Sequence, residues 1–455
     1  MNAPLMISVA GIRGIVGESL TPEVVARFAA AFARGLPKGP VVVGRDARIS
    51  GPAVFHAVAA GLMGAGRDVT DIGLATTPTT QIAVEHLRAA GGIILTASHN
   101  PAPWNALKFL SARGEFIGAR EGAAVRRRFD AGRGPWAPFD RLGSESREPG
   151  ALEWHLERVL GLEVLDRDAI RGRGLTVVVD GCASVGGIAV PRLLERLGAR
   201  VVELDCVPDG RFTRELEPLP QHLRRLSARV RESGADFGVA LDPDADRAAF
   251  VDGAGRPLGE EYTLALGLTA VLEKKRGPVV TNLSTSRIVD AVCARFGVTL
   301  HRSAVGEANV VAMMRARGAV AGGEGNGGMI VTDAHLGRDG LVATALVAQA
   351  VATSGRSLRE LADALPHLHM IKAKLPLPQR PWPRLATRLR AGFGGYRVRA
   401  GDGLWFGRGD EWLHVRPSGT EPVVRVIAET PGEARTRALV AGARAALAGR
   451  RTRRR

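Results

Sequence analysis

The chain has 455 residues, which is too many for one hydrophobic core and predicts three or four domains. Hydrophobic residues make up 45% and charged residues 24%, as in an ordinary globular protein, and no apolar run approaches the length of a membrane-spanning helix. The three cysteines, Cys182, Cys206 and Cys293, are far apart, which argues against a disulfide scaffold or a structural zinc site. A reducing cytoplasm is therefore the expected location.

The formal net charge of +16 comes mainly from arginine, because six lysines leave 56 arginines among the 62 basic residues. One interpretation is binding to nucleic acid or another polyanion. We favour the alternative, in which the arginines cover solvated helix faces, since aromatic residues for base stacking make up only 5%. The dense basic cluster at 450–455 is interpreted as a frayed tail. No nucleic-acid partner is expected, although a basic surface would attract phosphorylated substrates.

From the N-terminus onward, short apolar runs end in turns rich in Gly or Asp, and each is followed by apolar residues at helical spacing. The apolar runs lie at 41–43, 177–179 and 279–280, and the helical segments include 53–63, 190–197 and 288–296. Strands that alternate with helices predict βαβ units and parallel sheets.

A second repeat places a polar loop directly after a strand in three successive stretches of the chain. These strand-and-loop segments are 92–99, 237–244 and 319–326. Functional loops of α/β domains lie at the carboxyl ends of strands. Three similar α/β domains could therefore turn three polar loops toward one active site in a central cleft.

Turn-rich stretches at 132–149, 252–257 and 376–383 mark the expected domain boundaries. We predict α/β domains over 1–140, 150–254 and 255–367, followed by a smaller α+β domain over 375–449. The last domain is expected to contain a helix at 384–391, short strands to 427 and a helix from 431. The expected fold class is thus three similar α/β domains with mixed, mainly parallel sheets, plus a C-terminal α+β domain.

The first polar loop, 96–101, contains Ser98 and His99, and Lys108 lies shortly beyond it. A serine at the end of a strand can be nucleophilic when a base or a cation is close. The same residues could equally form a simple turn. The sequence Gly-x-Ser-x-Gly is absent here, so a serine hydrolase is not indicated.

The second polar loop has carboxylates at alternate positions, Asp242, Asp244 and Asp246, followed by Arg247. In an irregular loop such carboxylates can converge on one hard cation such as Mg²⁺ and leave room for a substrate or phosphoserine oxygen. Arg247 could neutralise phosphate charge. A solvated acidic turn is the alternative, and we favour it less because the loop follows an apolar strand.

Two further loops carry hydrogen-bonding groups. The loop at 323–328 offers Glu324 and Asn326, which suit sugar hydroxyls, although a glycine-rich hinge would explain the loop as well. The loop at 416–422 and the strand beyond it combine arginines, hydroxyls and a glycine amide into a phosphate cradle without a metal, formed by Arg416, Ser418, Gly419, Thr420 and Arg425. Together the four loops fit phosphoryl transfer, which depends on charge neutralisation and in-line positioning.

Two N-terminal motifs, at 11–14 and 44–51, and the four loops in this order resemble the α-D-phosphohexomutase family over nearly the whole chain. The resemblance implies that phosphorylated Ser98 gives its phosphoryl group to a hexose phosphate. A hexose 1,6-bisphosphate would form, reorient and return the other phosphoryl group to Ser98. The implied partner is a small hexose phosphate, and the protein would be a monomer or a homodimer.

The resemblance also implies roles for the loop residues. Mg²⁺ would be held by Ser98 and the three aspartates of the second loop, Asp242, Asp244 and Asp246. Charge stabilisation and help with proton transfer would come from Arg13, Lys108 and Arg247, with His99 nearby. The loop at 416–422 and Arg425 would hold the phosphate that does not react. Because this phosphate alternates between two positions on the sugar, the fourth domain is expected to move.

Some residues depart from the family pattern. The metal loop has Pro243 and Ala245 where glycine is more usual, and the sugar loop continues as Asn326-Gly327-Gly328, which leaves the sugar open. The motifs at 44–51 and 416–422 look closer to the branch that converts glucosamine 6-phosphate to glucosamine 1-phosphate, with mannose or glucose phosphates as the alternative. A phosphosugar phosphatase, which would release inorganic phosphate, is a further alternative.

Overall fold

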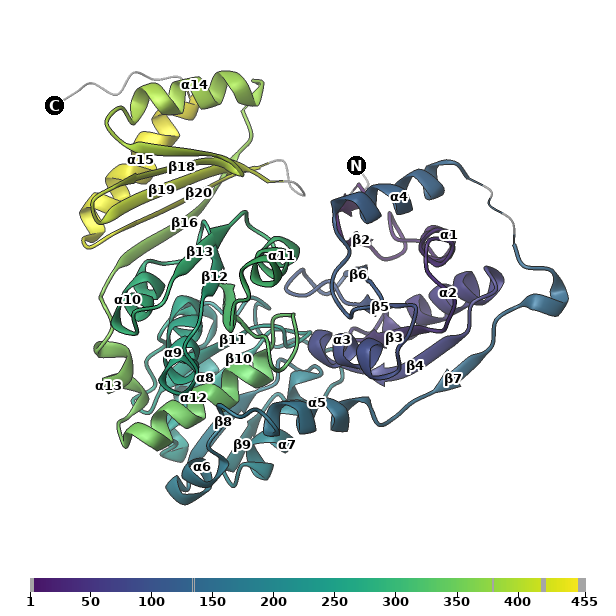
Figure 1. Ribbon diagram of the computed structural model, residues 1–455, viewed down its shortest axis with the longest axis horizontal. Helices are drawn as coiled ribbons and strands as arrows, with labels where there is room; N and C mark the ends of the chain where they lie inside the picture. Colours follow the sequence, from purple (N-terminus) through teal and green to yellow (C-terminus); the bar gives the residue numbers. More distant parts are fainter. Residues whose placement is uncertain (1–3, 133, 135, 379, 419–422, 449–455) are drawn as a thin grey trace.

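The computed structural model describes the chain apart from residues 1–3, 133, 135, 379, 419–422 and 449–455. Four sheets follow one another along the chain, and we number the domains built on them I to IV (Figure 1). Within the described residues, no helix is both long and apolar enough to cross a membrane.

Domain I is built on a seven-stranded sheet of order β1-β2-β6-β5-β3-β4-β7. Its strands are β1 (Met6–Ser8), β2 (Gly11–Ile15), β3 (Val41–Arg45), β4 (Val69–Leu74), β5 (Gly91–Leu95), β6 (Trp104–Leu110) and β7 (Glu145–Arg147). Its helices are α1 (Pro22–Ala33), α2 (Gly51–Gly64), α3 (Thr77–His86) and α4 (Ala119–Asp130). Strand β7 comes from the turn-rich stretch after residue 140 and pairs with β4 in parallel, so the sheet continues beyond the predicted end of this domain.

Domains II and III each have a four-stranded sheet, of order β11-β10-β8-β9 and β13-β12-β14-β15. The strands are β8 (Thr176–Asp180), β9 (Arg200–Leu204), β10 (Phe237–Leu241), β11 (Ala248–Asp252), β12 (Val279–Asn282), β13 (Leu300–Ser303), β14 (Ala321–Glu324) and β15 (Gly328–Val331). The helices are α5 (Ala151–Leu160), α6 (Arg167–Arg173), α7 (Gly186–Arg196), α8 (Arg224–Ser233), α9 (Glu260–Lys274), α10 (Ile288–Arg295), α11 (Glu307–Arg317), α12 (Gly340–Ser354) and α13 (Leu358–Asp363). In both sheets three strands are parallel and the last strand in the chain is antiparallel.

The strand-and-loop repeat of the sequence corresponds to one structural unit in each of these domains. An inner parallel strand leads into an antiparallel neighbour through the pairs β5–β6, β10–β11 and β14–β15. The three polar loops are the connections within these pairs. They are therefore short links fixed at both ends by buried strands, which restricts the positions of their side chains.

Domain IV has a wholly antiparallel five-stranded sheet of order β16-β20-β19-β18-β17. It contains β16 (His369–Pro376), α14 (Trp382–Gly392), β17 (Arg397–Gly401), β18 (Gly403–Arg408), β19 (Glu411–Pro417), β20 (Val423–Thr430) and α15 (Glu433–Ala448). Helix α14 begins two residues before the predicted start, because proline fits the first turn of a helix, where no backbone donor is needed.

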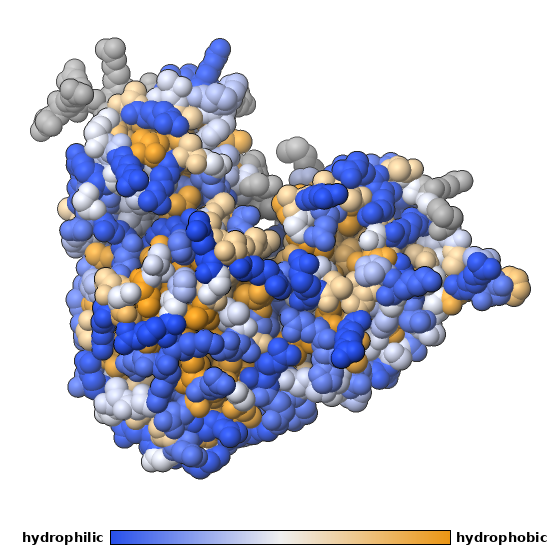
Figure 2. All heavy atoms as spheres, in the orientation of Figure 1, coloured by the Kyte–Doolittle hydropathy of each residue, from blue (hydrophilic) through white to orange (hydrophobic). Residues whose placement is uncertain are grey.

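The hydrophobic cores divide the chain differently from the sheets. Domains II and III share one continuous core, in which Val177 and Phe250 belong to the same cluster as Leu264 and Leu346. Domains I and IV have cores of their own. Figure 1 places domain I apart from domain IV with domains II and III between them, and the surface is hollowed between domains I and IV (Figure 2).

Candidate active site

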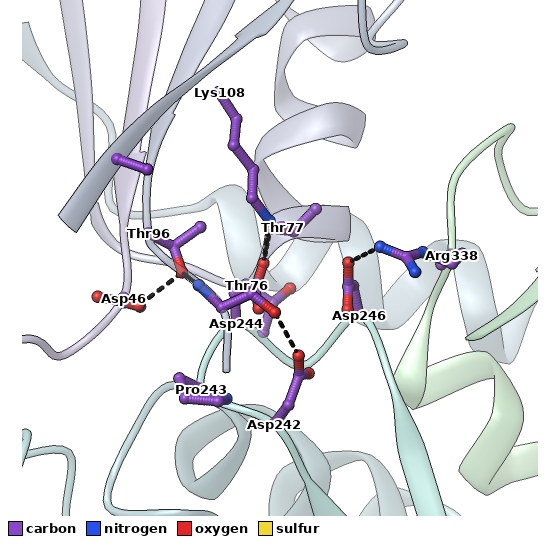
Figure 3. Close-up of polar contacts among 12 residues, drawn as sticks. Asp46, Thr76, Thr77, Thr96, Lys108, Asp242, Pro243, Asp244, Asp246 and Arg338 are labelled. Carbon is purple, nitrogen blue, oxygen red and sulfur yellow. Dashed lines mark hydrogen bonds and ion pairs between the residues drawn. The ribbon is translucent and has the colours of Figure 1, made fainter. Parts of the chain in front are cut away.

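Ser98 lies in the loop that joins β5 to β6 and is almost completely buried. Its backbone has a φ of 48°, a left-handed conformation that is unfavourable for a residue with a side chain. The Arg48 guanidinium fixes this conformation by donating hydrogen bonds of 2.6 Å to the carbonyl oxygens of Ser98 and Asn100. Asp46 in turn accepts hydrogen bonds from Arg48 and from the Thr96 hydroxyl, the latter at 2.6 Å (Figure 3). The motif at 44–51 therefore supports the serine loop.

The hydroxyl of Ser98 points from domain I to the aspartate loop of domain II. Its Oγ donates a hydrogen bond of 2.8 Å to Oδ2 of Asp242. Nδ1 of His99 lies 3.4 Å from the same Oγ. Ser98 and Asp242, which are 144 positions apart along the chain, thus belong to one site.

The aspartate loop joins β10 to β11 and buries three carboxylates completely. Asp242, Asp244 and Asp246 each offer an oxygen, and these oxygens all lie within 4.8 Å of one another. Oδ1 of Asp244 and Oδ1 of Asp246 are buried without a hydrogen-bond partner among the described residues. Buried acceptors that lack donors are costly, and a hard divalent cation with oxygen ligands would satisfy them. The three residues therefore fit a metal site.

The aspartates differ in their electrostatic surroundings. Burial, together with the nearby Asp246 and Asp244 carboxylates, raises the pKa of Asp242 well above its ordinary value. Burial would also raise the pKa of Asp244, but the Lys108 ammonium and the Thr77 hydroxyl outweigh it and hold that pKa below the ordinary value. Neighbouring positive groups thus compensate the negative charge of Asp242 less than that of Asp244.

Domain I supplies the groups that compensate Asp244. Lys108 Nζ and Thr77 Oγ1 each donate a hydrogen bond of 2.6 Å to Asp244 Oδ2 (Figure 3). Lys108 lies on β6, the strand that follows the Ser98 loop, and Thr77 is the first residue of α3. Strand β6 and the start of α3 in domain I therefore both bind the aspartate loop of domain II.

Arg338 connects the aspartate loop to domain III, although its sequence context gave no sign of this role. It is 8% exposed. Its guanidinium donates hydrogen bonds of 2.5 Å to Asp246 (Figure 3), 2.8 Å to Glu307 and 3.0 Å to Glu324. We call Asp242, Asp244 and Asp246 the aspartate cage. Arg338 thus links Asp246 of this cage to the loop predicted to bind the sugar.

The remaining basic residues near Ser98 surround it with positive charge. Arg247 lies 3.5 Å from Asp246 and 3.8 Å from Asp242. Arg13 donates a hydrogen bond of 3.0 Å to the side chain of Asn100 in the serine loop. Burial, with Arg247 and Arg13 adding to it, lowers the pKa of His99 well below its usual value, so this imidazole is neutral at physiological pH.

Glu324 ends β14 and is held by several donors. Its Oε1 accepts hydrogen bonds of 2.7 Å from Asn282 and 3.0 Å from the backbone of Gly306. Burial raises the pKa of Glu324, but Arg338 and these donors outweigh it and lower the pKa overall. Asn326 accepts a hydrogen bond from the backbone of Gly328 through its side-chain oxygen. The glycine-rich loop is therefore a tight β14–β15 connection with an ionised carboxylate at its start.

Domain IV contributes a row of cations across neighbouring strands. Arg416 on β19 lies opposite Arg425 on β20, and Arg425 lies opposite Lys374 on β16. Lys374 was not predicted, yet its charge is close enough to lower the pKa of His99 in domain I, after the larger effects of burial and the two arginines. Arg416 also lies 3.6 Å from Asp402. Of the other predicted cradle residues, Ser418 follows β19, whereas Gly419 and Thr420 lie outside the described residues.

Four family models match consecutive parts of the chain. Their descriptions are phosphoglucomutase/phosphomannomutase alpha/beta/alpha domain I, domain II, domain III and C-terminal domain, and they match residues 6–134, 155–255, 260–369 and 370–446. A phosphoglucomutase/phosphomannomutase of Thermococcus kodakarensis is 37% identical over 435 residues, which cover 94% of this chain and 95% of the relative. A probable phosphoglucosamine mutase of Methanopyrus kandleri is 37% identical over 437 residues, covering 94% of both chains.

Solved structures resemble the chain over its whole length. A phosphoglucomutase/phosphomannomutase family protein of Burkholderia thailandensis superimposes with a TM-score of 0.86 at 28% identity, covering 99% of this chain and 98% of the other. A putative phosphomannomutase of Thermus thermophilus gives 0.81 at 27% identity, with coverage of 98% and 99%. The four-domain architecture is therefore shared along the full chain.

Proposed function

The chain belongs to the phosphoglucomutase/phosphomannomutase family and is a phosphosugar mutase, and from this premise we propose that it interconverts hexose 6-phosphate and hexose 1-phosphate through a phosphorylated Ser98. The observation that carries the proposal is the 2.8 Å hydrogen bond from the Ser98 hydroxyl to Asp242 across the interface of domains I and II. A phosphoryl group on this oxygen would lie next to the aspartate cage and the cations around it.

The cage is the proposed metal site. A divalent cation, for which Mg²⁺ is our candidate, would be held by Asp242, Asp244 and Asp246 and would supply charge neutralisation for the phosphoryl group when bound. The Oδ1 atoms of Asp244 and Asp246, which are buried without a hydrogen-bond partner among the described residues, support this assignment. Lys108 of domain I keeps the carboxylate of Asp244 in place, and Arg338 keeps that of Asp246 in place.

The transfer itself is assigned to residues of this chain. The bond between the phosphorus and Ser98 Oγ breaks as a bond to a sugar hydroxyl oxygen forms. The proton of that hydroxyl passes to a base, and the leaving Ser98 Oγ takes up a proton and becomes a free hydroxyl again. His99 is our candidate base because its imidazole is neutral and Nδ1 lies 3.4 Å from Ser98 Oγ. Arg13 and Arg247 stabilise the charge that develops on the phosphoryl oxygens. The resulting hexose 1,6-bisphosphate reorients and returns its other phosphoryl group to Ser98.

The phosphate that does not react is assigned to the cations of domain IV, which are Arg416, Arg425 and Lys374. Ser418, Gly419 and Thr420 are proposed to complete this cradle. The sugar hydroxyls are assigned to Glu324 and Asn326. Because the same cradle must hold either phosphate of the bisphosphate, domain IV has to shift relative to domains I to III between the two half-reactions.

Glucosamine 6-phosphate is our first candidate for the substrate. The probable phosphoglucosamine mutase of Methanopyrus kandleri supports it, and the phosphoglucomutase/phosphomannomutase of Thermococcus kodakarensis, which is equally similar at 37% identity, supports mannose or glucose phosphates as the alternative. The decisive experiment compares kcat/KM for glucosamine, mannose and glucose 6-phosphates with purified protein, Mg²⁺ and the matching bisphosphate. A preference of tenfold or more for glucosamine 6-phosphate is expected, and equal or reversed values would overturn this choice.

The phosphoserine is tested separately. Ser98→Ala should lose at least about 99.9% of activity even with bisphosphate supplied, because it removes the hydroxyl that is hydrogen-bonded to Asp242 and is proposed to carry the phosphoryl group. Intact-protein mass measurement should find one phosphoryl group on the active wild type and none on the variant. Ser233→Ala, at the half-buried last residue of α8, is the matched control and should be fully active. Release of inorganic phosphate without isomerised sugar would instead indicate a phosphatase.

A further inference from the structure

A pocket outside the proposed active site lies between domain III and domain IV. Its volume is about 340 Å³. Domain III contributes Arg287 and Arg302, from the start of α10 and from β13, and domain IV contributes Arg397 and Arg399 from β17 and Arg408 from β18. In Figure 1 the sheet of domain IV lies above β13 and α10. The pocket is lined from both domains.

The pocket carries more positive charge than its own carboxylates can neutralise. Asp290 is bound by Arg302 at 2.5 Å. Glu411 accepts hydrogen bonds from Arg408 and from Arg435. Arg397 and Arg399 are exposed and have no ion-pair partner among the described residues. Two guanidinium groups therefore remain available for an anion from solution.

Several of the arginines are held in place without an anion. Arg302 donates hydrogen bonds of 3.0 and 2.8 Å to the backbone oxygens of Asn282 and Thr285. Arg399 on β17 is the cross-strand partner of Trp405 on β18. Its guanidinium lies 5.2 Å from the centre of the Trp405 ring. A cation over an aromatic face is restrained while its N–H edge stays free to bind. The site is thus largely preformed, which reduces the entropic cost of binding.

The position of the pocket links it to the proposed phosphate cradle. Trp412 lines the pocket, and residues 412, 414 and 416 lie on one face of β19 because side chains alternate along a strand. Arg416 is therefore on the same face of the sheet as the pocket, roughly 13 Å farther along the strand. Between them His414 is hydrogen-bonded to Ser284 of domain III at 2.8 Å. An anion in the pocket would therefore contact domains III and IV, separated from Arg416 by the contact of His414 with Ser284.

We propose that this pocket binds a small polyanion with adjacent phosphoryl groups, such as inorganic oligophosphate or the phosphate chain of a nucleotide. Arg397 and Arg399 bind its oxygens from domain IV, and the N–H groups of Arg287 that are not hydrogen-bonded to Gly409 bind them from domain III, so the ligand ties domain IV to domain III. Clusters of arginine suit this chemistry because each guanidinium can donate two parallel hydrogen bonds to phosphate oxygens. By joining the two domains, the ligand restrains the movement of domain IV and lowers kcat. This effect on kcat rests on the proposed function, but the binding of the anion is independent of it.

Calorimetric titration with inorganic tripolyphosphate in Mg²⁺-free buffer tests binding. The background variant Arg416→Gln weakens the competing cradle in the active site. On this background we expect one tripolyphosphate to bind per chain. Adding the two substitutions Arg397→Gln and Arg399→Gln should lower the affinity for tripolyphosphate at least tenfold. The control pair Arg384→Gln and Arg390→Gln removes the same charge from α14, which packs on the other face of the sheet, and should leave the affinity unchanged.

Unchanged binding in the Arg397 and Arg399 pair, an equal loss in the control pair, or orthophosphate binding as tightly as tripolyphosphate would each overturn the proposal. A nucleoside triphosphate that binds as tightly as tripolyphosphate identifies the phosphate chain as the ligand, and one that binds more tightly adds a contact to the base. In the otherwise wild-type enzyme, tripolyphosphate should lower kcat, and the Arg397 and Arg399 pair should remove this effect. Binding without a change in kcat would refute the restraint of domain IV, and binding by an inactive protein would refute the proposed function alone.

Discussion

Replacing Arg338 by methionine tests whether one buried cation holds the aspartate cage and the glycine-rich loop together. The substitution leaves Asp246, Glu307 and Glu324, all of which are buried, without the guanidinium that lies 2.5 to 3.0 Å from them. Removing one partner of a buried ion pair costs about 3–5 kcal/mol, and three carboxylates share this partner. We therefore expect the unfolding free energy of the metal-free protein to fall by at least about 3 kcal/mol.

A divalent cation should reverse part of this loss. Bound at the cage, it places positive charge beside Asp246, so Mg²⁺ should raise the melting temperature of Arg338→Met more than that of the wild type. Both effects are measured by thermal and urea unfolding, with Mg²⁺ and with a chelator. Unfolding is monitored by a spectroscopic signal from the core that domains II and III share. kcat should also fall, because Glu324 loses the group that orients it.

Two further variants separate charge from geometry. Arg338→Lys keeps a charge but cannot reach three carboxylates with one ammonium group, so its stability should lie between the wild type and Arg338→Met. Arg317→Met removes an exposed arginine at the end of α11 and should change stability by less than about 0.5 kcal/mol. The reasoning is refuted if Arg338→Met loses less than about 1 kcal/mol, or if Mg²⁺ stabilises it no more than the wild type.

Three other outcomes are expected. Burial and the neighbouring carboxylates raise the pKa of Asp242, so ionising this group costs the folded state free energy; Asp242→Asn should therefore make the metal-free protein more stable at pH 7, while its stabilisation by Mg²⁺, measured by melting temperature, should shrink. Burial lowers the pKa of His99, so the unfolded chain takes up more protons as the pH falls below about 6.5; melting temperatures between pH 8 and 5 should therefore fall less steeply for His99→Gln than for the wild type. Lys374→Ala should raise KM about tenfold with little change in melting temperature, because this exposed ammonium lies opposite Arg425 in the cradle, and an unchanged KM would remove it from the site.

The repeat of strand and loop was readable from the sequence because it depends on local patterns. An apolar run followed by Asp242, Asp244 and Asp246 identifies both a buried strand and a loop with costly charges. The alternation with helices predicted mainly parallel sheets, and the structure confirms this fold class in domains I to III and the α+β class in domain IV. The departure at Ala245 also has a structural meaning, since its φ of 51° is one that glycine adopts without strain.

Among 56 arginines, the sequence did not single out Arg338, and it placed Arg48 in the motif at 44–51 without indicating its role. Their roles come from contacts with residues far away in the chain, such as Arg48 with Ser98, and an arginine on a solvated helix has the same local appearance. Lysine was the more informative residue in retrospect. Of the six lysines, Lys108 binds Asp244, Lys372 binds the backbone of Gly325, and Lys374 joins the row of cations in domain IV.

The sequence by itself therefore determined which chemical groups the protein has and the strands that each of them follows. These properties depend on residue type and on periodicity over a few positions, and both are local. The tertiary structure decided which groups meet, because the Ser98 hydroxyl reaches Asp242 and the Arg338 guanidinium reaches Asp246 and Glu324 only when separate domains pack together. It also decided the charge state of His99 and the compensation of each aspartate, since pKa shifts depend on burial and on neighbours that chain order does not specify.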